Sequence, residues 1–212
     1  LKFIIPARMG SKGLPFKNRK LFEYTARTIK EVHRDVIVSS DDEEIEKLSK
    51  EHGFNFHKRS PNNSRDESSL KDVMEEVISD YKIDKNDIVV VLLLTSPGRN
   101  FKDIQKGLNF FKKHKCKSML CRTPAKVSPY LLFYKNDLHG EQVINHDLCR
   151  RQDYKECFQV SHFLCIFKVS ELIRLNKNLL TQDTFFMDLD PDSLVDIDTC
   201  EDMKYFLNKK ER

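Results

Sequence analysis

The chain has 212 residues, of which 33% are charged, and its formal net charge is only +4. This length suits one α/β domain, and the near balance of charges disfavours a protein that binds RNA or DNA. The longest apolar run, residues 88–94, is too short to cross a membrane, which takes about 18 or more residues. We therefore expect a soluble protein without a nucleic-acid or membrane partner.

The six cysteines form no C-x-x-C pair and no regular framework, which is typical of reduced thiols. The first residues lead directly into a strand-like stretch, with no secretory leader in view. We therefore expect a cytoplasmic protein. A zinc site formed by Cys116, Cys121 and His114 is an alternative, although structural zinc sites usually have closer ligand pairs.

Apolar periodicity alternates between strand and helix over the first 121 residues. The stretch from Asp87 to Leu94 is apolar on both faces, as the centre of a helix-covered parallel sheet requires. Together these features predict an α/β fold with a doubly wound, mainly parallel sheet and right-handed crossovers. The expected strands are 2–5, 35–39, 54–57, 87–94 and 118–121, and the expected helices are 41–53, 68–81 and 101–113.

The rhythm of strands and helices breaks between residues 122 and 159, where residues 128–146 alternate around turn-forming pairs. We expect a β-hairpin-like excursion here that leaves the main body of a single domain, 1–212. A strand follows at 163–168, a helix opens near Ser170, and a last helix begins after 195–199. The acidic stretch 188–192 lacks the spacing of a calcium loop, and we interpret it as a solvated turn.

Ligands of such sheets bind at the carboxyl ends of the strands. The loop after the first strand, which lies within the stretch IPARMGSKGLPFKN ending at Asn18, suits an anion. Its glycines allow close backbone approach, and Arg8, Lys12 and Lys17 add positive charge. The loop is not a Walker A motif, so the pattern alone fits either a phosphate-binding loop or a basic surface turn.

Asp196 and Asp198 are two residues apart in a stretch expected to be extended, so both side chains should emerge on the same face. Two such carboxylates can share a hard cation such as Mg²⁺. The alternative is an ordinary helix N-terminus, capped by Asp198 or Thr199.

The order of these stretches resembles that of the acylneuraminate cytidylyltransferases, the CMP-sialic acid synthetases. The opening loop resembles the family's IPARGGSKGLPGKN nearly residue for residue. Four more segments and the stretch VDIDTCEDM follow in the family's order, so the resemblance spans residue 4 to about residue 207. The four segments begin at Val38, Arg59, Leu94 and Arg150.

The resemblance implies a Rossmann-like nucleotidyltransferase fold and a reaction between CTP and the C2 hydroxyl of a nonulosonic acid. The products would be a CMP-sugar and pyrophosphate, and the cofactor would be Mg²⁺. By resemblance the catalytic residues are Arg8, Lys12 and Asp198, and the metal ligands are Asp196 and Asp198. The nucleotide-binding residues are Arg8, Ser11, Lys12, Lys17, Asn18, Arg59, Ser68 and Ser69, and the sugar-binding residues are Leu93, Thr95, Arg151, Ser161 and His162.

The match fails mainly where the sugar should bind. Leu93 stands where the family has glutamine, Ser161 where it has asparagine, and His162 where it has glycine. Exchanges of polar contacts of this kind change substrate specificity strongly. Arg151 fits a family arginine near the acceptor and could pair with the sugar carboxylate, or it could form a surface ion pair with Asp153.

The resemblance also implies a C2 homodimer in which the excursion 122–159 is a dimerisation arm. The stretch between Leu21 and Val36 is shorter than in the family. Either the protein lacks these residues, or it has a mobile loop here that the residues given leave out. Two alternatives stay open: a related nucleotidyltransferase with another nucleotide or sugar, and a nucleotide-binding homologue without turnover.

Overall fold

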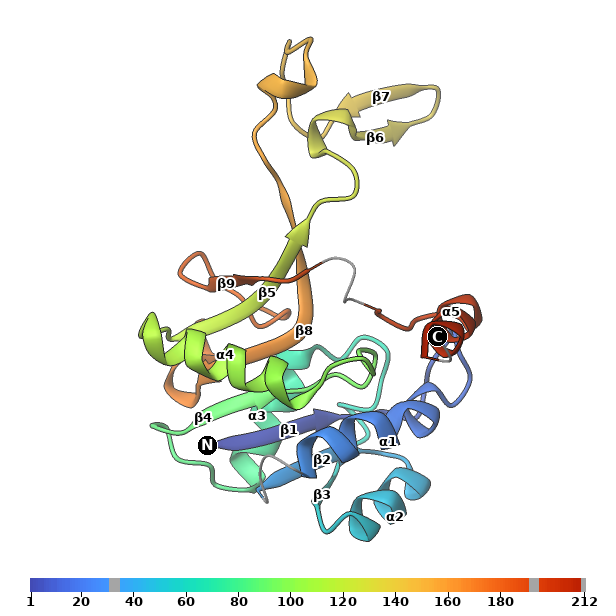
Figure 1. The fold of residues 1–212 in the computed structure, drawn as a ribbon, viewed down its shortest axis with the longest axis vertical. Coiled ribbons are helices and arrows are strands. Elements are labelled where there is room, and N and C mark those ends of the chain that lie inside the picture. The colour runs from blue at the N-terminus through green and yellow to red at the C-terminus, as the bar shows by residue number, and fades with distance from the viewer. Residues whose placement is uncertain (31–34, 191–194, 211–212) are drawn as a thin grey trace.

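A computed structural model describes residues 1–30, 35–190 and 195–210 of the chain (Figure 1). Its centre is a seven-stranded sheet with the order β3-β2-β1-β4-β8-β5-β9. The strands are β1 (Lys2–Pro6), β2 (Val36–Ser40), β3 (Asn55–Lys58), β4 (Ile88–Val91), β5 (Ser118–Pro124), β8 (Phe158–Lys168) and β9 (Phe185–Asp188).

Only β8 runs against the other strands of this sheet, because it pairs antiparallel with both β4 and β5. The remaining pairs are parallel, so the predicted mainly parallel sheet is confirmed. The direction of β8 has a simple cause. The chain leaves the sheet at the end of β5 and returns beside it, as in a hairpin with a long insertion.

Two hydrophobic cores cover the two faces of the sheet. One core contains Phe3 and Ile5 of β1 together with the buried sides of α1 (Lys17–Lys30), α2 (Glu43–Glu51), α4 (Phe101–Lys113) and α5 (Cys200–Lys210). The other contains Ile4 of β1, α3 (Leu70–Asp80) and the 3₁₀ segment η3 (Val169–Arg174). Neighbouring residues of one strand thus face opposite cores, as β geometry requires.

Every strand and helix expected from the sequence is present, with shifts of a few residues at the ends, and the helix expected near Ser170 is the 3₁₀ segment η3. The structure adds α1 and β9, which the sequence did not predict. Helix α1 covers most of the stretch whose length was in question, and residues 31–34 lie outside the described residues. The solvated turn expected at 188–192 is wrong for Asp188, which ends β9 and pairs with Arg122 at 2.6 Å; residues 191 and 192 lie outside the described residues.

The excursion forms an arm that extends from the tips of β5 and β8 (Figure 1). It contains the predicted hairpin, β6 (Phe133–Asn136) and β7 (His139–Gln142), and two 3₁₀ turns, η1 (Pro129–Leu131) and η2 (Arg151–Asp153). The rings of Tyr130 and Tyr154 stack 4.9 Å apart. The arm has little else to bury, and it leaves Phe133 65% and Leu138 99% exposed.

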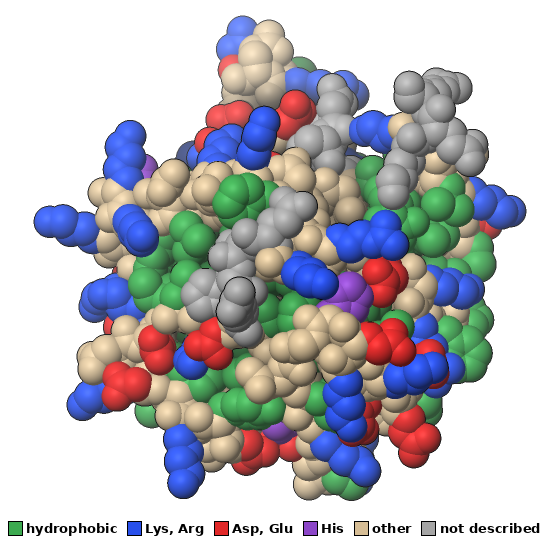
Figure 2. Space-filling model, turned by 60° about the horizontal axis from the view of Figure 1, so that its bottom comes forward, with side chains coloured by type: hydrophobic (Ala, Val, Ile, Leu, Met, Phe, Trp, Pro, Cys, Tyr) green, Lys and Arg blue, Asp and Glu red, His purple; other side chains and the backbone are tan. Residues whose placement is uncertain are grey.

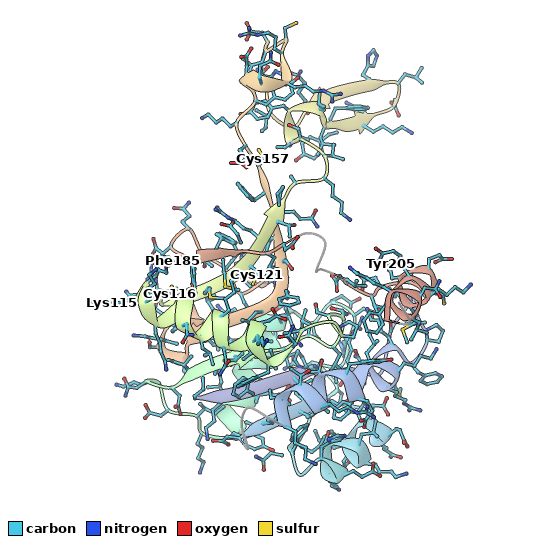
Figure 3. All side chains as sticks on the ribbon, in the orientation of Figure 1. Lys115, Cys116, Cys121, Cys157, Phe185 and Tyr205 are labelled. Atoms are coloured by element: carbon cyan, nitrogen blue, oxygen red, sulfur yellow. The ribbon has the colours of Figure 1, made fainter. Side chains whose placement is uncertain are left out.

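All six cysteines are free, with Cys157 near the base of the arm and Cys116 and Cys121 in the main body (Figure 3). The alternative zinc site is not supported, because Cys116, Cys121 and His114 do not gather into a metal-sized group among the described residues. In the same part of the chain no helix is both long and apolar enough to cross a membrane. The cytoplasmic location stays a prediction.

Positive and negative side chains are interspersed on the face of the molecule shown in Figure 2. This distribution agrees with the small net charge and offers no broad basic stripe on that face for a nucleic-acid backbone.

Candidate active site

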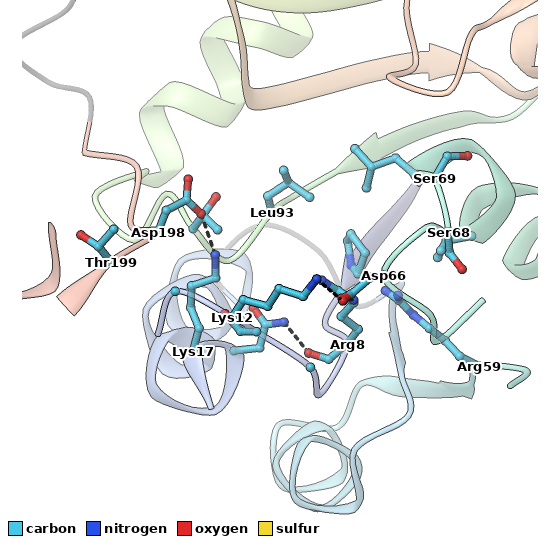
Figure 4. Close-up of a pocket in the computed structure, with 18 residues that line it drawn as sticks. Arg8, Lys12, Lys17, Arg59, Asp66, Ser68, Ser69, Leu93, Asp198 and Thr199 are labelled. Carbon is cyan, nitrogen blue, oxygen red and sulfur yellow. Dashed lines mark hydrogen bonds and ion pairs between the residues drawn. The ribbon is translucent and has the colours of Figure 1, made fainter. Parts of the chain in front are cut away.

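The site lies where the strand order reverses. Strand β1 is hydrogen-bonded to β2 on one side and to β4 on the other, and the loops after these strands meet at one edge of the sheet. A cavity of about 570 Å³ opens there. All eight residues predicted to bind the nucleotide line it (Figure 4): Arg8, Ser11, Lys12, Lys17, Asn18, Arg59, Ser68 and Ser69. Gly10, Gly13, Leu93, Thr95 and Asp198 also contribute to its wall.

The backbone of the loop after β1 is held in place by side chains other than its cations Arg8, Lys12 and Lys17. The Met9 backbone N–H donates to Asp41 Oδ1 at 2.7 Å. Asn18 Nδ2 donates to the Arg8 carbonyl at 2.8 Å, so this amide fixes the loop in addition to lining the cavity. The backbone is therefore fixed while the cationic side chains stay at the cavity wall.

Asp66 lies among these cations and was not predicted. Its carboxylate accepts a hydrogen bond from Arg8 and pairs with Lys12 at 2.8 Å (Figure 4). The two cations hold the pKa of Asp66 below its usual value, and Asp66 in turn raises the pKa of Lys12. An anionic ligand in this cavity would compete with Asp66 for the same two side chains.

The opening loop also contacts the carboxylate segment near the other end of the chain. Lys17 Nζ lies 2.7 Å from Asp198 Oδ1 (Figure 4). A Cβ atom at Gly13 would overlap the backbone carbonyl oxygen of Asp198, so the glycine allows the two segments to pack closely. The cations of the opening loop and the carboxylate of Asp198 therefore meet at one cavity.

Asp198 does not cap the last helix. Asp202 N donates to Thr199 Oγ1 at 3.2 Å, and the Asp202 carboxylate accepts from the backbone N–H groups of Asp198 and Thr199. Thr199 and Asp202 thus satisfy the start of α5 between them. The Asp198 carboxylate is left to face Lys17 and the cavity.

A second cavity of about 580 Å³ adjoins the first, and Leu93, Thr95 and Asp198 line both. Three side chains predicted to bind the sugar or the metal, Ser161, His162 and Asp196, belong to this second cavity alone. The structure therefore separates a cationic chamber from a neighbouring chamber, and four of the five residues predicted to bind the sugar line the second one. Residues from 123 to 126, from 159 to 162 and from 195 to 205 contribute to its wall.

The two aspartates fit a hard cation. Ile197 is fully buried, and Asp196 and Asp198 on either side of it reach the second cavity, which agrees with the predicted alternation. Asp196 is an exposed residue overall, but protein atoms crowd its carboxyl; this burial and the charge of Asp198 raise its pKa, although a Thr95 hydrogen bond opposes them. Two carboxylates that line one cavity supply the oxygen ligands that Mg²⁺ prefers.

The start of α3 closes the first cavity on a further side. Ser69 caps the helix and forms a capping box with Asp72, and Ser68 Oγ donates to the Asn62 carbonyl. The hydroxyls of both serines are thus already used within the protein. What they offer to a ligand is chiefly the positive end of the helix dipole.

Arg99 fixes the wall between the two cavities from behind. Its buried guanidinium donates to the carbonyl oxygens of Leu93 at 2.9 Å and Phe163 at 2.5 Å. Burial lowers its pKa to about 10. The side chain thus sets the Leu93 loop against β8, the strand that carries Ser161 and His162.

Arg151 is the one predicted site residue outside both cavities. It lies on the arm, beside Tyr154 and Leu131. The ion pair with Asp153 is made by Arg150, at 2.9 Å, and not by Arg151. Lys126 lines the second cavity. The sequence does not reveal this residue as part of the site, because it lies in the excursion 122–159, which is predicted to leave the main body.

Solved structures share this fold over the whole chain. A CMP:2-keto-3-deoxy-manno-octonic acid synthetase solved with CTP matches with a TM-score of 0.66 at 16% identity, covering 100% of this chain and 99% of that one. A 4-diphosphocytidyl-2C-methyl-D-erythritol synthase from Anaerococcus prevotii matches with a TM-score of 0.65 at 15% identity, covering 100% and 96%. The fold is therefore that of the nucleotidyltransferases, as predicted.

The sequence comparisons narrow this class. A cytidylyltransferase family model matches residues 2–119, and the chain belongs to that family. It is 26% identical to the N-acylneuraminate cytidylyltransferase of Streptococcus agalactiae over 94% of this chain and 50% of that protein. The corresponding protein of Oncorhynchus mykiss is 29% identical over 71% of this chain and 37% of its own length. The predicted family resemblance is confirmed, and the chain spans about half the length of the S. agalactiae relative.

Proposed function

We propose that the chain is a cytidylyltransferase that joins CTP to the C2 hydroxyl of a nonulosonic acid and releases pyrophosphate. One observation carries this proposal. Asp198 lines both cavities and also contacts Lys17 and the backbone at Gly13, so a triphosphate and an acceptor would meet at this carboxylate. The family match to residues 2–119 supports the nucleotide half of the proposal.

The residues of the first cavity suit the demands of the reaction. Attack of a hydroxyl on the α-phosphate needs alignment and neutralisation of the charge that builds up on the leaving pyrophosphate. Arg8, Lys12 and Lys17 supply fixed positive charge at the cavity wall, and Ser11 adds a hydroxyl between them. We assign nucleotide binding to these residues, together with Asn18, Arg59, Ser68 and Ser69, and catalysis to Arg8, Lys12 and Asp198.

Asp196 and Asp198 would hold Mg²⁺. A bound Mg²⁺ would neutralise phosphate oxygens and help to orient the triphosphate. Asp198 already shares one oxygen with Lys17, which leaves its second oxygen for a cation. Lys17 would then remain close enough to serve the phosphates.

The second cavity would take the sugar acid. Its wall combines Thr95, Ser161 and His162 with the ammonium group of Lys126, which suits an acceptor that carries both hydroxyls and a carboxylate. Leu93 places an apolar side chain on the wall shared with the nucleotide cavity. This wall favours an acceptor different from that of relatives with a glutamine there.

Pyrophosphate release tests the proposal. We expect release when the chain is mixed with CTP, Mg²⁺ and a panel of nonulosonic acids, and no release without the sugar. We also expect CTP to raise the melting temperature more than GTP, UTP or ATP, because a ligand that binds only the folded state stabilises it. No release across the panel would contradict the proposal, and a preference for another nucleotide would identify a related nucleotidyltransferase.

The apolar Leu93 on the shared wall also favours one alternative, a nucleotide-binding homologue without turnover. That alternative predicts stabilisation by CTP with no product from any acid. The same two measurements therefore separate the alternatives.

We further propose that the arm, residues 122–159, makes a homodimer with a second copy of the chain. Five large apolar side chains between residues 131 and 138 are each at least 43% exposed, and a group of this kind usually marks an interface, whereas a single exposed apolar residue does not. We expect a dimer by light scattering, and we expect Phe133→Asp combined with Leu138→Asp to shift the mass to a monomer. The matched control is Ile173→Asp, which charges a residue that is 82% exposed outside the arm and should leave the dimer intact.

The partner's arm is also the route by which Arg151 could reach a sugar cavity, because within its own chain it lies outside both cavities. A monomeric wild-type chain would contradict the dimer and this role of Arg151 together.

A further inference from the structure

Arg59 is a buried cation whose guanidinium group is hydrogen-bonded to the protein through Nε. The residue follows β3 and is only 7% exposed. Its Nε donates to Ser39, to the carbonyl oxygen and to Oγ, both at 3.1 Å. Its other two guanidinium nitrogens make no hydrogen bond within the described residues, and the group points into the first cavity (Figure 4). Burial lowers its pKa to about 10.

A chain of hydrogen bonds continues behind Ser39. Ser39 and His57 are direct partners in the pairing of β2 with β3. Ser39 Oγ lies 3.1 Å from His57 Nδ1, and His57 Nε2 lies 3.0 Å from Asp80 Oδ2 at the end of α3. His57 is buried, whereas the Asp80 side chain is 58% exposed. The chain therefore links a surface carboxylate to a buried guanidinium in the cavity.

The donors in this chain fix its direction. Arg59 Nε can only donate, so Ser39 Oγ accepts from it. Asp80 Oδ2 can only accept, so the proton of a neutral His57 is on Nε2, and Nδ1 accepts the hydroxyl proton of Ser39. Each hydrogen bond of the chain then has one donor and one acceptor.

We propose that His57 is a positioning residue that holds Arg59, through Ser39, for an anionic oxygen of the bound nucleotide. This inference rests on the proposed function, because it takes the ligand of the first cavity to be a nucleotide. Arg59 has a fixed base and two free nitrogens, and such a fork suits a phosphate oxygen pair. Loss of the Ser39 Oγ contact would leave Nε held by the Ser39 carbonyl oxygen alone, which fixes the direction of the guanidinium less tightly.

Glu76 faces the same histidine from α3, and the ligand atoms of His57, Glu76 and Asp80 lie within 4.8 Å of one another. Glu76 is already used by the loop after Arg59, because it accepts from Ser60 N at 2.7 Å and from Asn63 Nδ2 at 2.5 Å. The proton assigned to Nε2 favours a hydrogen-bond chain at this place over a metal site.

Two substitutions of His57 separate its two nitrogens. In His57→Asn the amide oxygen takes the place of Nδ1 and can still accept from Ser39, whereas the amide of His57→Gln takes the place of Nε2. Both variants lose the imidazole ring. We expect the Kd for metal-free CTP, measured by calorimetry, to rise about tenfold in His57→Gln, as for the loss of a buried charge-assisted contact, and about twofold in His57→Asn.

His52→Gln is the matched control. His52 pairs with Glu23 at 2.8 Å, lies outside the first cavity, and should leave the Kd within about twofold. Equal Kd values for His57→Gln and His57→Asn would overturn the inference. Zinc binding by the wild-type chain that His57→Gln abolishes would also overturn it, because a metal site would then replace the hydrogen-bond chain.

Nuclear magnetic resonance tests the positioning without any nucleotide. We expect the wild-type His57 to show the Nε2–H tautomer, and we expect the Arg59 Nε–H resonance to move in His57→Gln but to stay near its wild-type position in His57→Asn. An Nδ1–H tautomer, or an Arg59 resonance indifferent to both changes, would overturn the inference whatever the chain binds. If the resonances behave as expected but no nucleotide binds, the proposed function is wrong and the hydrogen-bond chain stands.

Discussion

Asp198→Asn should leave a folded protein that binds CTP but has lost at least about 100-fold in turnover, the usual cost of removing a charge that stabilises the transition state. The amide keeps the shape of the side chain and removes one of the two carboxylates that would hold Mg²⁺. Since Thr199 and Asp202 satisfy the start of α5, the change should not disturb that helix.

Lys17 gives this experiment a second readout. Its ammonium group pairs with Asp198 at 2.7 Å, and the substitution removes that competing negative charge. We therefore expect metal-free CTP to bind Asp198→Asn at least as tightly as it binds the wild type. Calorimetry without metal and pyrophosphate release with Mg²⁺ should move in opposite directions, which simple unfolding would not produce.

Asp188→Asn is the matched control. Asp188 pairs with Arg122 at 2.6 Å and lines neither of the two cavities, so its neutralisation should leave turnover within about twofold of the wild type. Turnover that survives in Asp198→Asn, or that falls equally in both variants, would remove Asp198 from the catalytic machinery.

The sequence predicted the fold well where apolar patterning is strong. Strand β4 was predicted from a stretch that is apolar on both faces, and helix α3 from apolar residues that recur on one face. Both patterns are strong because burial restricts the residue types at these positions. Helix α1 was missed because its first residues were read as part of the phosphate loop. Only five of its fourteen residues are buried, and no acidic residue marks its first turn. Strand β9 is four residues long and half exposed, so its pattern carries little information.

The candidate site was predicted unevenly for a related reason. Arg8, Lys12 and Asp198 belong to compact motifs whose chemistry is visible in the sequence. Asp66 and Lys126 belong to no such motif. Asp66 joins the site because the fold pairs it with Arg8, and Lys126 because the fold places it at the wall of the second cavity. No spacing in the sequence links such residues to their partners. Arg151 shows the reverse case, since a motif pointed to a cavity that Arg151 of the same chain does not line.

The contact between Gly13 and Asp198 leads to the second large effect. A methyl group at Gly13 would overlap the Asp198 carbonyl oxygen, which is backbone and cannot turn aside. Gly13→Ala should therefore push the loop and the carboxylate segment apart and stretch the pair between Lys17 and Asp198. We expect turnover to fall about 100-fold, since a displacement of about 1 Å between reacting groups can cost that much.

Gly10→Ala is the control that the loop itself offers. A methyl group at Gly10 would find its nearest neighbour, Arg8 Nη1, 3.9 Å away, so this change should cost less than about threefold in turnover. Both variants replace a glycine of the same loop by alanine, so the comparison isolates the overlap with Asp198. If Gly10→Ala were the impaired variant and Gly13→Ala the active one, the close packing of loop and carboxylate segment would have no part in the chemistry. The expected order, with Gly13 the sensitive position, requires the two ends of the chain to form one site.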